Sequence, residues 1–182
     1  MDRQSALKQG REMALVVFKL GREEFASEIA SVREISRMLP ITPIPEAPRF
    51  LQGVVNLRGR VIAVIDLAQK LGLYRPEGSF SEYSEKGLKP RRMMVVEAGE
   101  EIYGLAVDEM PEVLKVNEEA MEGPPEMILT QMTRNFIKGL AKVGERFIPI
   151  LNLKEILSPS APARRTEAPR AEGFHGQDSG GG

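Results

Sequence analysis

Hydrophobic and polar residues alternate in short runs along most of the chain, and these runs come in pairs. The run MALVVFKLG at 13–21 is followed by EEFASEI at 23–29, and RRMMVVEAG at 91–99 is followed by EEIYGLAV at 100–107. The first run of each pair is rich in β-branched and large apolar residues and ends at a glycine, which is typical of a strand that enters a tight turn. The pattern therefore predicts two matching β-hairpins.

A second pair of hairpins follows the same logic. GVVNLRGRVIAVIDL at 53–67 and GLAKVGERFIPILNL at 139–153 align with glycine, arginine, isoleucine and leucine at the same places. Leucine then recurs at helical spacing in DLAQKLGL at 66–73 and in NLKEILS at 152–158. Each of these segments begins with a residue suited to cap a helix, so a short helix is expected after each hairpin.

The paired hairpins indicate an internal repeat that spans most of residues 13–157. At an offset of 78 residues Gly21 aligns with Gly99 and Phe25 with Tyr103, and at an offset of 86 the second hairpins align. The conserved order predicts two similar β units of about 65 residues each, closed or nearly closed because small sheets protect their edges in that way. Only the first copy has the sequence NLRG, at 56–59, in its turn.

Three segments fall outside the repeat. Residues 1–12 are expected to form a flexible or helical extension, and the polar, turn-rich residues 74–92 are expected to connect the two copies. From 158 to 182 the chain is crowded with proline, glycine, alanine and charged residues, and this composition predicts a disordered tail because it buries too little apolar surface to offset the entropy of ordering.

Composition excludes several classes of function. The 25 Lys and Arg balance 26 Asp and Glu, so the chain offers no basic field to nucleic acid. Cysteine is absent, which removes disulfides and thiolate metal sites. The apolar runs are far shorter than the roughly 20 residues of a membrane-spanning helix, and the N-terminus lacks the apolar centre of a signal peptide. A cytoplasmic protein without direct membrane insertion is expected.

The residues required for catalysis are also missing. The only histidine, His175, lies in the predicted tail, so it cannot complete a nucleophilic triad or a metal site. No phosphate-binding glycine motif occurs, and adjacent acidic pairs such as Glu23 and Glu24 would point to opposite faces of a strand. The cluster Lys89, Arg91 and Arg92 is interpreted as a solubilising loop. We therefore predict no enzymatic activity, no cofactor and no metal, and a protein that functions through its surface.

Five motifs in order resemble the CheW-like domain family of chemotaxis coupling proteins. They are F-x-L-G-x-x-x-F at 18–25, V-x-E-I at 32–35, ITPIPEAP at 41–48, F-L-x-G-V-V-N-L-R-G at 50–59 and V-I-D-L at 64–67. The resemblance covers about 13–157 and is shared by the regulatory domain of the histidine kinase CheA, but the chain has no room for a kinase domain. A stand-alone adaptor is the better match.

The resemblance implies an all-β fold of two intertwined, SH3-like five-stranded β-barrel subdomains with short helices. It implies an adaptor that couples the cytoplasmic tip of chemoreceptors to the regulatory domain of CheA, recruited to receptor arrays at the inner face of the membrane. In this family the glutamate of V-x-E-I pairs with the arginine of N-L-R-G, which here are Glu34 and Arg58. Asn56 and Gly59 are expected to shape the turn that carries this arginine.

Two further sets of residues are predicted to bind partners. Ile29, Val32 and Val107 are the candidate apolar anchors for a receptor helical hairpin. A separate kinase-binding face is expected on the hairpin that contains Val61, Ala63 and Ile65, because an adaptor with a single face could not hold two partners at once. Ala63 departs from the family, which commonly has proline at this position.

Rival functions remain open to different degrees. An enzyme built on carboxylates lacks histidine and cysteine, and an SH3-like nucleic-acid module would need a basic stripe with exposed aromatic residues. A coupling protein of a related receptor–kinase array, with surface motility or another output, is the alternative that these residues do not separate from swimming chemotaxis.

Overall fold

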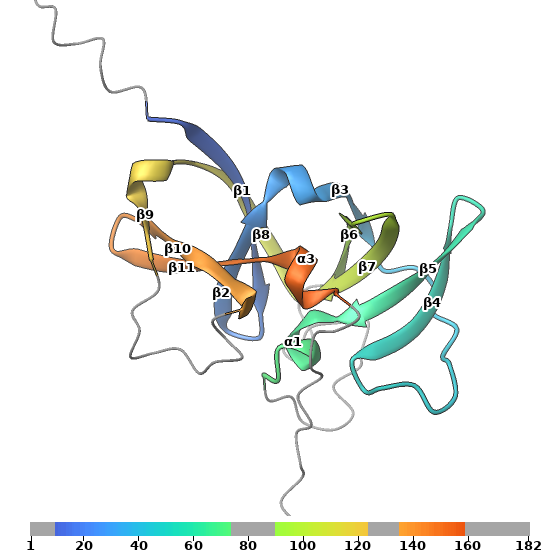
Figure 1. Ribbon diagram of the computed structural model, residues 1–182. Helices are drawn as coiled ribbons and strands as arrows, with labels where there is room; N and C mark the ends of the chain where they lie inside the picture. Colours follow the sequence, from blue (N-terminus) through green and yellow to red (C-terminus); the bar gives the residue numbers. More distant parts are fainter. Residues whose placement is uncertain (1–9, 74–89, 124–134, 159–182) are drawn as a thin grey trace, which may run out of the picture.

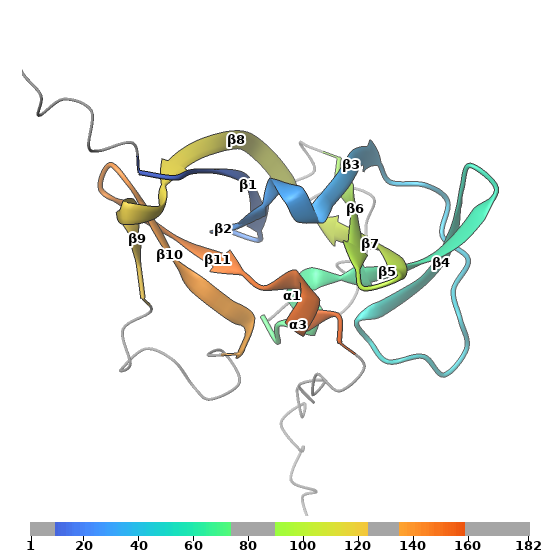
Figure 2. The same ribbon diagram turned by 45° about the horizontal axis from the view of Figure 1, so that its top comes forward.

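The described part of the chain folds into two β-sheets that lie side by side, with the short helices α1 and α3 between them (Figures 1 and 2). The structure, a computed structural model, describes residues 10–73, 90–123 and 135–158. Most of the predicted N-terminal extension, most of the polar connection and the tail after Ser158 lie outside these residues.

The first copy of the repeat contains the two predicted hairpins and the predicted helix. A 3-10 helix and one further strand lie between the hairpins. Its elements are β1 (Glu12–Leu20), β2 (Glu23–Glu28), the 3-10 helix η1 (Ile29–Ser31), β3 (Val32–Arg37), β4 (Leu51–Leu57), β5 (Arg60–Asp66) and α1 (Leu67–Lys70).

The second copy has the same succession, with a second 3-10 helix and a two-residue strand after its third strand. Its elements are β6 (Arg92–Ala98), β7 (Glu101–Val107), β8 (Glu109–Asn117), η2 (Glu118–Ala120), β9 (Met121–Glu122), β10 (Ile137–Val143), β11 (Arg146–Leu151) and α3 (Leu153–Ile156). The offset of 86 residues superposes β4, α1 and their counterparts end to end, so the repeat predicted from the sequence is present in the structure.

Each sheet draws strands from both copies. The first sheet has the order β8-β1-β2-β11-β10-β9 and the second has the order β3-β6-β7-β5-β4. Both orders follow one plan, in which the first hairpin of one copy lies between the third strand and the second hairpin of the other. The hairpins of different copies meet in parallel, β2 with β11 and β5 with β7. We call the first of the two sheets the β1 sheet and the second the β6 sheet.

This exchange corrects the expectation that each copy folds as a unit of its own. Alternation of apolar residues places a strand in a sheet but does not choose its neighbour, so the partner copy is decided by packing between the two halves. The intertwined arrangement implied by the family resemblance agrees with the strand orders. The β1 sheet has six strands because β9 pairs with β10 at its edge.

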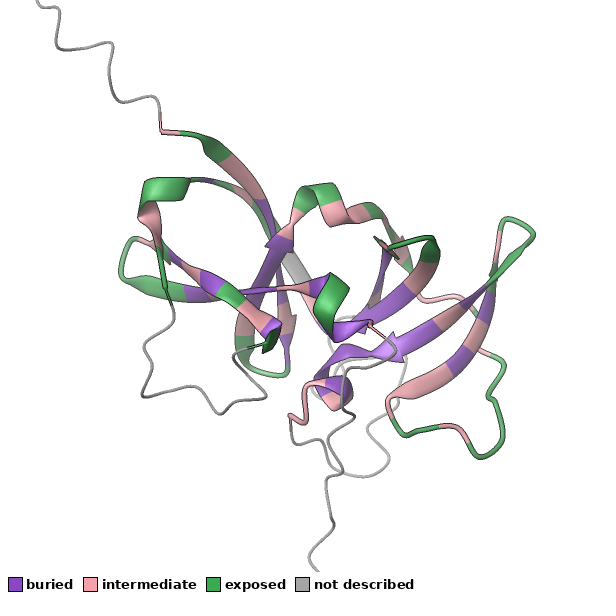
Figure 3. Ribbon diagram, viewed as in Figure 1, coloured by how far each residue is buried: buried purple, intermediate pink, exposed green. Residues whose placement is uncertain are grey.

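Three hydrophobic clusters fill this architecture. One lies inside the β1 sheet around Leu15 and Ile148, and one lies inside the β6 sheet around Val55 and Met93. The largest lies between the sheets and includes Phe18, together with residues of both short helices. Figure 3 shows buried residues on the strands of both sheets and on the inner sides of α1 and α3. Burial of both faces of a strand explains the continuous apolar runs near the sheet junction.

The two helices begin as the sequence predicts. The Asp66 side chain accepts a hydrogen bond from the backbone N–H of Gln69 at 3.0 Å, and the Asn152 side chain is placed to accept one from Glu155 at 3.5 Å. Such caps satisfy N–H groups that have no partner inside the helix. Each helix is a single turn that follows a strand directly.

Candidate functional site

Glu34 and Arg58 form the ion pair that the family resemblance implies. Arg58 Nη1 donates to Glu34 Oε2 at 2.6 Å, and Arg58 Nη2 donates to Glu34 Oε1 at 3.2 Å. The two parallel hydrogen bonds fix both the distance and the orientation of the guanidinium. The Arg58 side chain is 77% exposed and that of Glu34 is 27% exposed. The pair is therefore a surface feature that a partner can reach.

The turn that carries Arg58 is shaped by its neighbours. Asn56 Oδ1 accepts a hydrogen bond from the N–H of Gly59 at 2.7 Å, and Gly59 has φ of +84°. Arg58 itself has φ of +51°, in the left-handed region. This conformation costs a residue with a Cβ about 1–2 kcal/mol. The sequence analysis foresaw a turn stabilised by Asn56 and Gly59, but it did not foresee strain at the arginine.

The three apolar residues predicted to anchor a receptor lie in different environments. Ile29, in η1, is 42% exposed. Val32, at the start of β3, is partly buried and packs against the cluster between the sheets. Val107 is fully buried in that cluster, so it is a core residue and not a surface anchor. The last four residues of β7 are all buried, so both faces of the strand are covered there. Ile35, which the sequence analysis did not select, is 48% exposed on β3.

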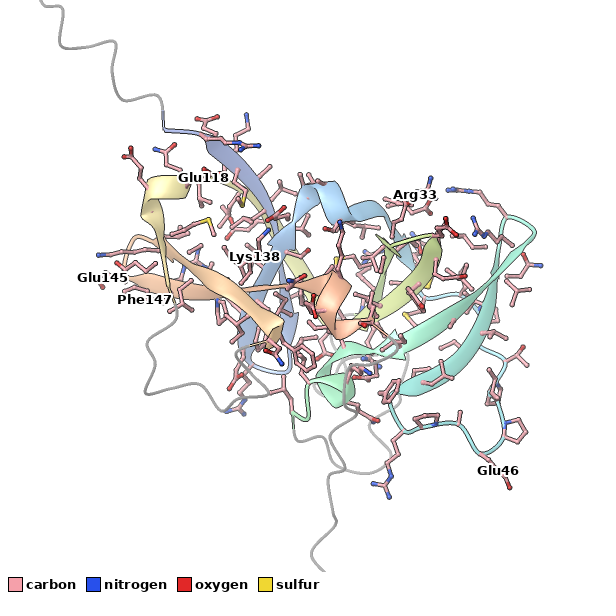
Figure 4. The ribbon with its side chains drawn as sticks, in the orientation of Figure 1. Arg33, Glu46, Glu118, Lys138, Glu145 and Phe147 are labelled. Atoms are coloured by element: carbon pink, nitrogen blue, oxygen red, sulfur yellow. The ribbon has the colours of Figure 1, made fainter. Side chains whose placement is uncertain are left out.

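The predicted kinase-binding hairpin also divides between surface and core. Val61 is 65% exposed and Ala63 is half-buried, whereas Ile65 is 6% exposed and belongs to the cluster between the sheets. Ile65 is therefore corrected to a core position, for the same reason as Val107. Phe147, labelled in Figure 4, occupies the place of Val61 on the other hairpin and is 52% exposed.

A buried charged cluster was missed by the sequence analysis. Arg91 Nη2 donates to Asp66 Oδ2 at 2.9 Å, and Arg91 Nε lies 3.1 Å from Asp108 Oδ1. Asp108 Oδ2 also accepts a hydrogen bond from the N–H of Gly21 at 2.5 Å. All three side chains are almost completely buried. Arg91 is thus an internal residue that joins both copies of the repeat, and not part of a solubilising loop.

A buried lysine, Lys70, lies on α1, the helix that Asp66 caps. The Lys70 ammonium lies 4.2 Å from the centroid of the Phe50 ring, where the ring face attracts a cation. Burial lowers the pKa of Lys70 below its usual value, because removal from water disfavours the charged form. In the second copy Ile156 stands at this position and is fully buried. The first copy therefore carries a charge at Asp66 and Lys70, where the second copy has the neutral Asn152 and Ile156.

Among the described residues, neither a group of metal ligands nor a membrane-spanning helix is found. Across residues 10–73, 90–123 and 135–158, no three histidine, aspartate or glutamate side chains are grouped as metal ligands would be. Of the helices in these ranges, none has the length and apolar character needed to cross a membrane.

Comparison with known proteins places these features in one family. The sequence model of the CheW-like domain matches residues 14–160. The probable chemotaxis protein CheW of Rhizobium etli is 33% identical over 153 residues, which cover 84% of this chain and 92% of that protein. The chemotaxis protein CheW of Rhizobium meliloti is 30% identical over 159 residues, which cover 87% and 92%.

A solved structure supports the same assignment. The scaffolding protein TtCheW from Thermoanaerobacter tengcongensis superposes with a TM-score of 0.70 at 31% sequence identity. The match covers 85% of this chain and 99% of that one. The likeness therefore extends over most of both chains.

Proposed function

The chain belongs to the CheW-like domain family and is a coupling scaffold of chemotaxis signalling; on this premise we propose that it joins chemoreceptor tips to the histidine kinase CheA. It acts by binding, has no catalytic activity of its own, and works in the cytoplasm at receptor arrays on the inner face of the membrane. The receptor-side surface includes Glu34, Arg58 and the exposed Ile29. The kinase-side surface includes Val61.

Arg58 is the observation that carries this proposal. The first copy holds an arginine in the left-handed conformation, whereas the second copy has Gly144, with φ of +63°, at the equivalent place. Glycine adopts that conformation without a steric penalty. Backbone strain of this kind is concentrated at sites where it serves a function. An exposed arginine kept at this cost and fixed by Glu34 supports a recognition role.

The exposed apolar side chains support separate faces for the two partners. Ile29 lies in η1, between the sheets, whereas Val61 lies at the far end of the β6 sheet, in the hairpin of β4 and β5. Each can anchor a modest contact, and many such contacts in an array produce a stable assembly through multivalency. Val32 is a poorer probe than Ile29, because a charged residue there would also disturb the core against which it packs.

Two single substitutions test the separation of the faces. Ile29→Glu is expected to weaken binding of a receptor cytoplasmic fragment by about ten-fold and to leave binding of the kinase regulatory domain within about two-fold. Only the few anchor residues of an interface cost more than about 1 kcal/mol when they are lost, and Ile29 is proposed as such an anchor for the receptor alone. Val61→Glu is expected to have the opposite effect. Both affinities are measured by isothermal titration calorimetry, with circular dichroism to confirm folding.

Matched controls come from the other copy. Val113→Glu and Phe147→Glu introduce the same charge at side chains that are 54% and 52% exposed, so they control for the charge alone. A competition measurement completes the test. Full displacement of the kinase domain by the receptor fragment would show that the two partners share one surface and would contradict the proposal.

A further inference from the structure

A cleft of about 480 Å³ opens at the junction of the two sheets. Its walls come from η1, from the β6–β7 turn and from the start of α3, three elements that Figures 1 and 2 show close together. Lys138, labelled in Figure 4, extends from β10 at one side and pairs with Glu28 of β2. Ile29 and Val61 do not line this cleft, although its wall includes the residues next to Ile29 in η1.

The offsets of the repeat place the cleft opposite the buried charged cluster. Gly99, Ala30 and Asn152 line the cleft, and they are the counterparts of Gly21, Asp108 and Asp66. The two glycine turns have the same shape, with φ of +65° at Gly21 and +67° at Gly99. The glycine turn and the capping residue of the short helix thus occur at both places, although Ala30 lies in η1 whereas Asp108 lies between β7 and β8. We call the place that Asp108 occupies the filled frame and its counterpart at the cleft the open frame.

The filled frame shows which chemical group is missing from the open one. In the charged cluster the Asp108 carboxylate accepts a hydrogen bond from the N–H of Gly21 and pairs with Arg91. In the cleft the methyl group of Ala30 replaces that carboxylate. Among the described residues, no side chain accepts from the N–H of Gly99 as Asp108 accepts from Gly21. The open frame therefore lacks a carboxylate at this N–H.

The charges around the cleft favour the same group. Lys138 and Lys154 replace the neutral Gln52 and Ala68 of the filled side. The acidic residues of the lining are already paired, Glu28 with Lys138 and Glu97 with Arg33. Lys154 is exposed and makes no ion pair with a described carboxylate. An incoming carboxylate would therefore meet a backbone N–H and an available ammonium.

We propose that this cleft binds an acidic side chain of a partner protein, whose carboxylate occupies the place that Asp108 occupies in the buried charged cluster. The carboxylate accepts a hydrogen bond from the N–H of Gly99 and pairs with Lys154. The cleft is larger than one carboxylate requires, so residues that flank the acidic side chain enter with it and contact Leu151 and Ala30.

A peptide titration followed by NMR tests this site directly. The probe is a blocked pentapeptide with aspartate between two pairs of alanines, and the matched control peptide has asparagine at the centre. We expect the aspartate peptide to shift the amide resonance of Gly99 downfield in a saturable way and to bind at least five-fold more tightly than the asparagine peptide. Lys154→Gln, at an exposed position, should weaken the aspartate peptide by at least three-fold without affecting folding.

A second variant fills the cleft from within. Ala30→Asp supplies the missing carboxylate, so the amide resonance of Gly99 should move toward that of Gly21 without peptide, and peptide binding should be abolished. Ala120→Asp adds the same charge in the other 3-10 helix and should leave binding unchanged. Equal binding of the two peptides, or undiminished binding by Ala30→Asp, would overturn the proposal.

Discussion

The β1 sheet and the β6 sheet share one strand plan but differ at the hairpin turn that faces their edge strand. In the β6 sheet Arg58 reaches Glu34 of β3 from a strained left-handed position. In the β1 sheet the left-handed position is Gly144, and the cation is Arg146 at the start of β11. Arg146 pairs with Glu24 at 3.1 Å and with Glu112 of β8 at 3.3 Å.

Glu112 is the counterpart of Glu34. In both sheets an ion pair therefore connects an edge strand, β3 or β8, to the second hairpin toward the opposite end of the strand order. The β1 sheet achieves this from a strand residue, with glycine in the turn and without backbone strain. Closure of the sheet therefore does not require an arginine with positive φ. The strain at Arg58 is specific to the first copy, which agrees with a role in recognition and not in folding.

The two sides of the sheet junction show a second contrast. One side is closed by the buried charged cluster, and the other is the cleft lined by Ala30 and Asn152. Exchange of hairpins gives both sides the same strand plan, but the backbone differs locally, because Ala30 lies in η1 whereas Asp108 lies between β7 and β8. This local difference and the side chains together decide which side is closed. A symmetric scaffold can in this way carry unlike surfaces.

The largest expected effect removes the cation of the charged cluster. Arg91→Met leaves Asp66 and Asp108 buried without their shared partner, and loss of one member of a buried ion pair typically costs about 3–5 kcal/mol. Urea unfolding followed by circular dichroism measures the free energy of unfolding. The control is Arg92→Met, at the half-exposed neighbouring residue, with an expected change within about 0.5 kcal/mol. Equal losses in the two variants would mean that the cluster does not stabilise the junction.

The equivalent glycines Gly53 and Gly139 provide the next comparison. A Cβ on Gly53 would lie 2.1 Å from the carbonyl oxygen of Thr42, at φ of +142°, whereas a Cβ on Gly139 would meet nothing closer than 3.4 Å. The contact is rigid because Thr42 and Val54 exchange two backbone hydrogen bonds of 2.9 Å. We expect Gly53→Ala to lower the free energy of unfolding by about 3 kcal/mol and Gly139→Ala by less than about 1 kcal/mol.

Thermal unfolding of these two variants, measured side by side, checks this difference. Similar losses of stability would indicate that the backbone beside Gly53 moves to accommodate a Cβ as easily as the backbone beside Gly139 does. The close approach of the two strands at Gly53 would then not be a constraint on the fold.

The sequence predicted local structure better than pairing between distant segments. The hairpins and the capped helices follow from patterns within a few residues, the repeat follows from the recurrence of those patterns 78 and 86 residues later, and the structure contains all of them. The burial of Arg91 depends on Asp66 and Asp108, which are distant from it in the sequence, so the local charge pattern indicated a loop instead. Val107 and Ile65 were taken as surface residues for the same reason, because alternation does not show that a second sheet covers the strand.

The resemblance to a family supplied what local patterns could not. It implied the intertwined barrels and the pairing of Glu34 with Arg58, both of which depend on contacts between distant segments. It could not indicate the positive φ of Arg58 or the unequal sides of the sheet junction, because these depend on how this particular pair of copies differs.

The smallest change in stability is expected at Arg58, where the change in signalling should be large. Arg58→Gly removes an exposed ion pair worth about 0–1 kcal/mol and relieves the left-handed strain, but it increases the entropy of the unfolded chain, so stability should change by less than about 1 kcal/mol. Receptor-stimulated kinase activity in a reconstituted array should still fall by about ten-fold, because the guanidinium is lost. Arg60→Ala, two residues away, should leave both quantities nearly unchanged.

A double-mutant cycle with Glu34→Ala and Arg58→Ala separates pairing from recognition. The 77% exposure of Arg58 predicts a coupling energy of about 0.5 kcal/mol in urea unfolding, well below that of a buried pair. If Glu34 acts only by orienting Arg58, Glu34→Ala should reduce kinase stimulation less than Arg58→Gly does. In Glu34→Ala the guanidinium is still present and can contact the receptor, although its orientation is no longer fixed. A loss of stimulation that merely follows the loss of stability across the cycle would instead make the pair a structural clasp, equivalent to Arg146 and Glu112 in the other sheet.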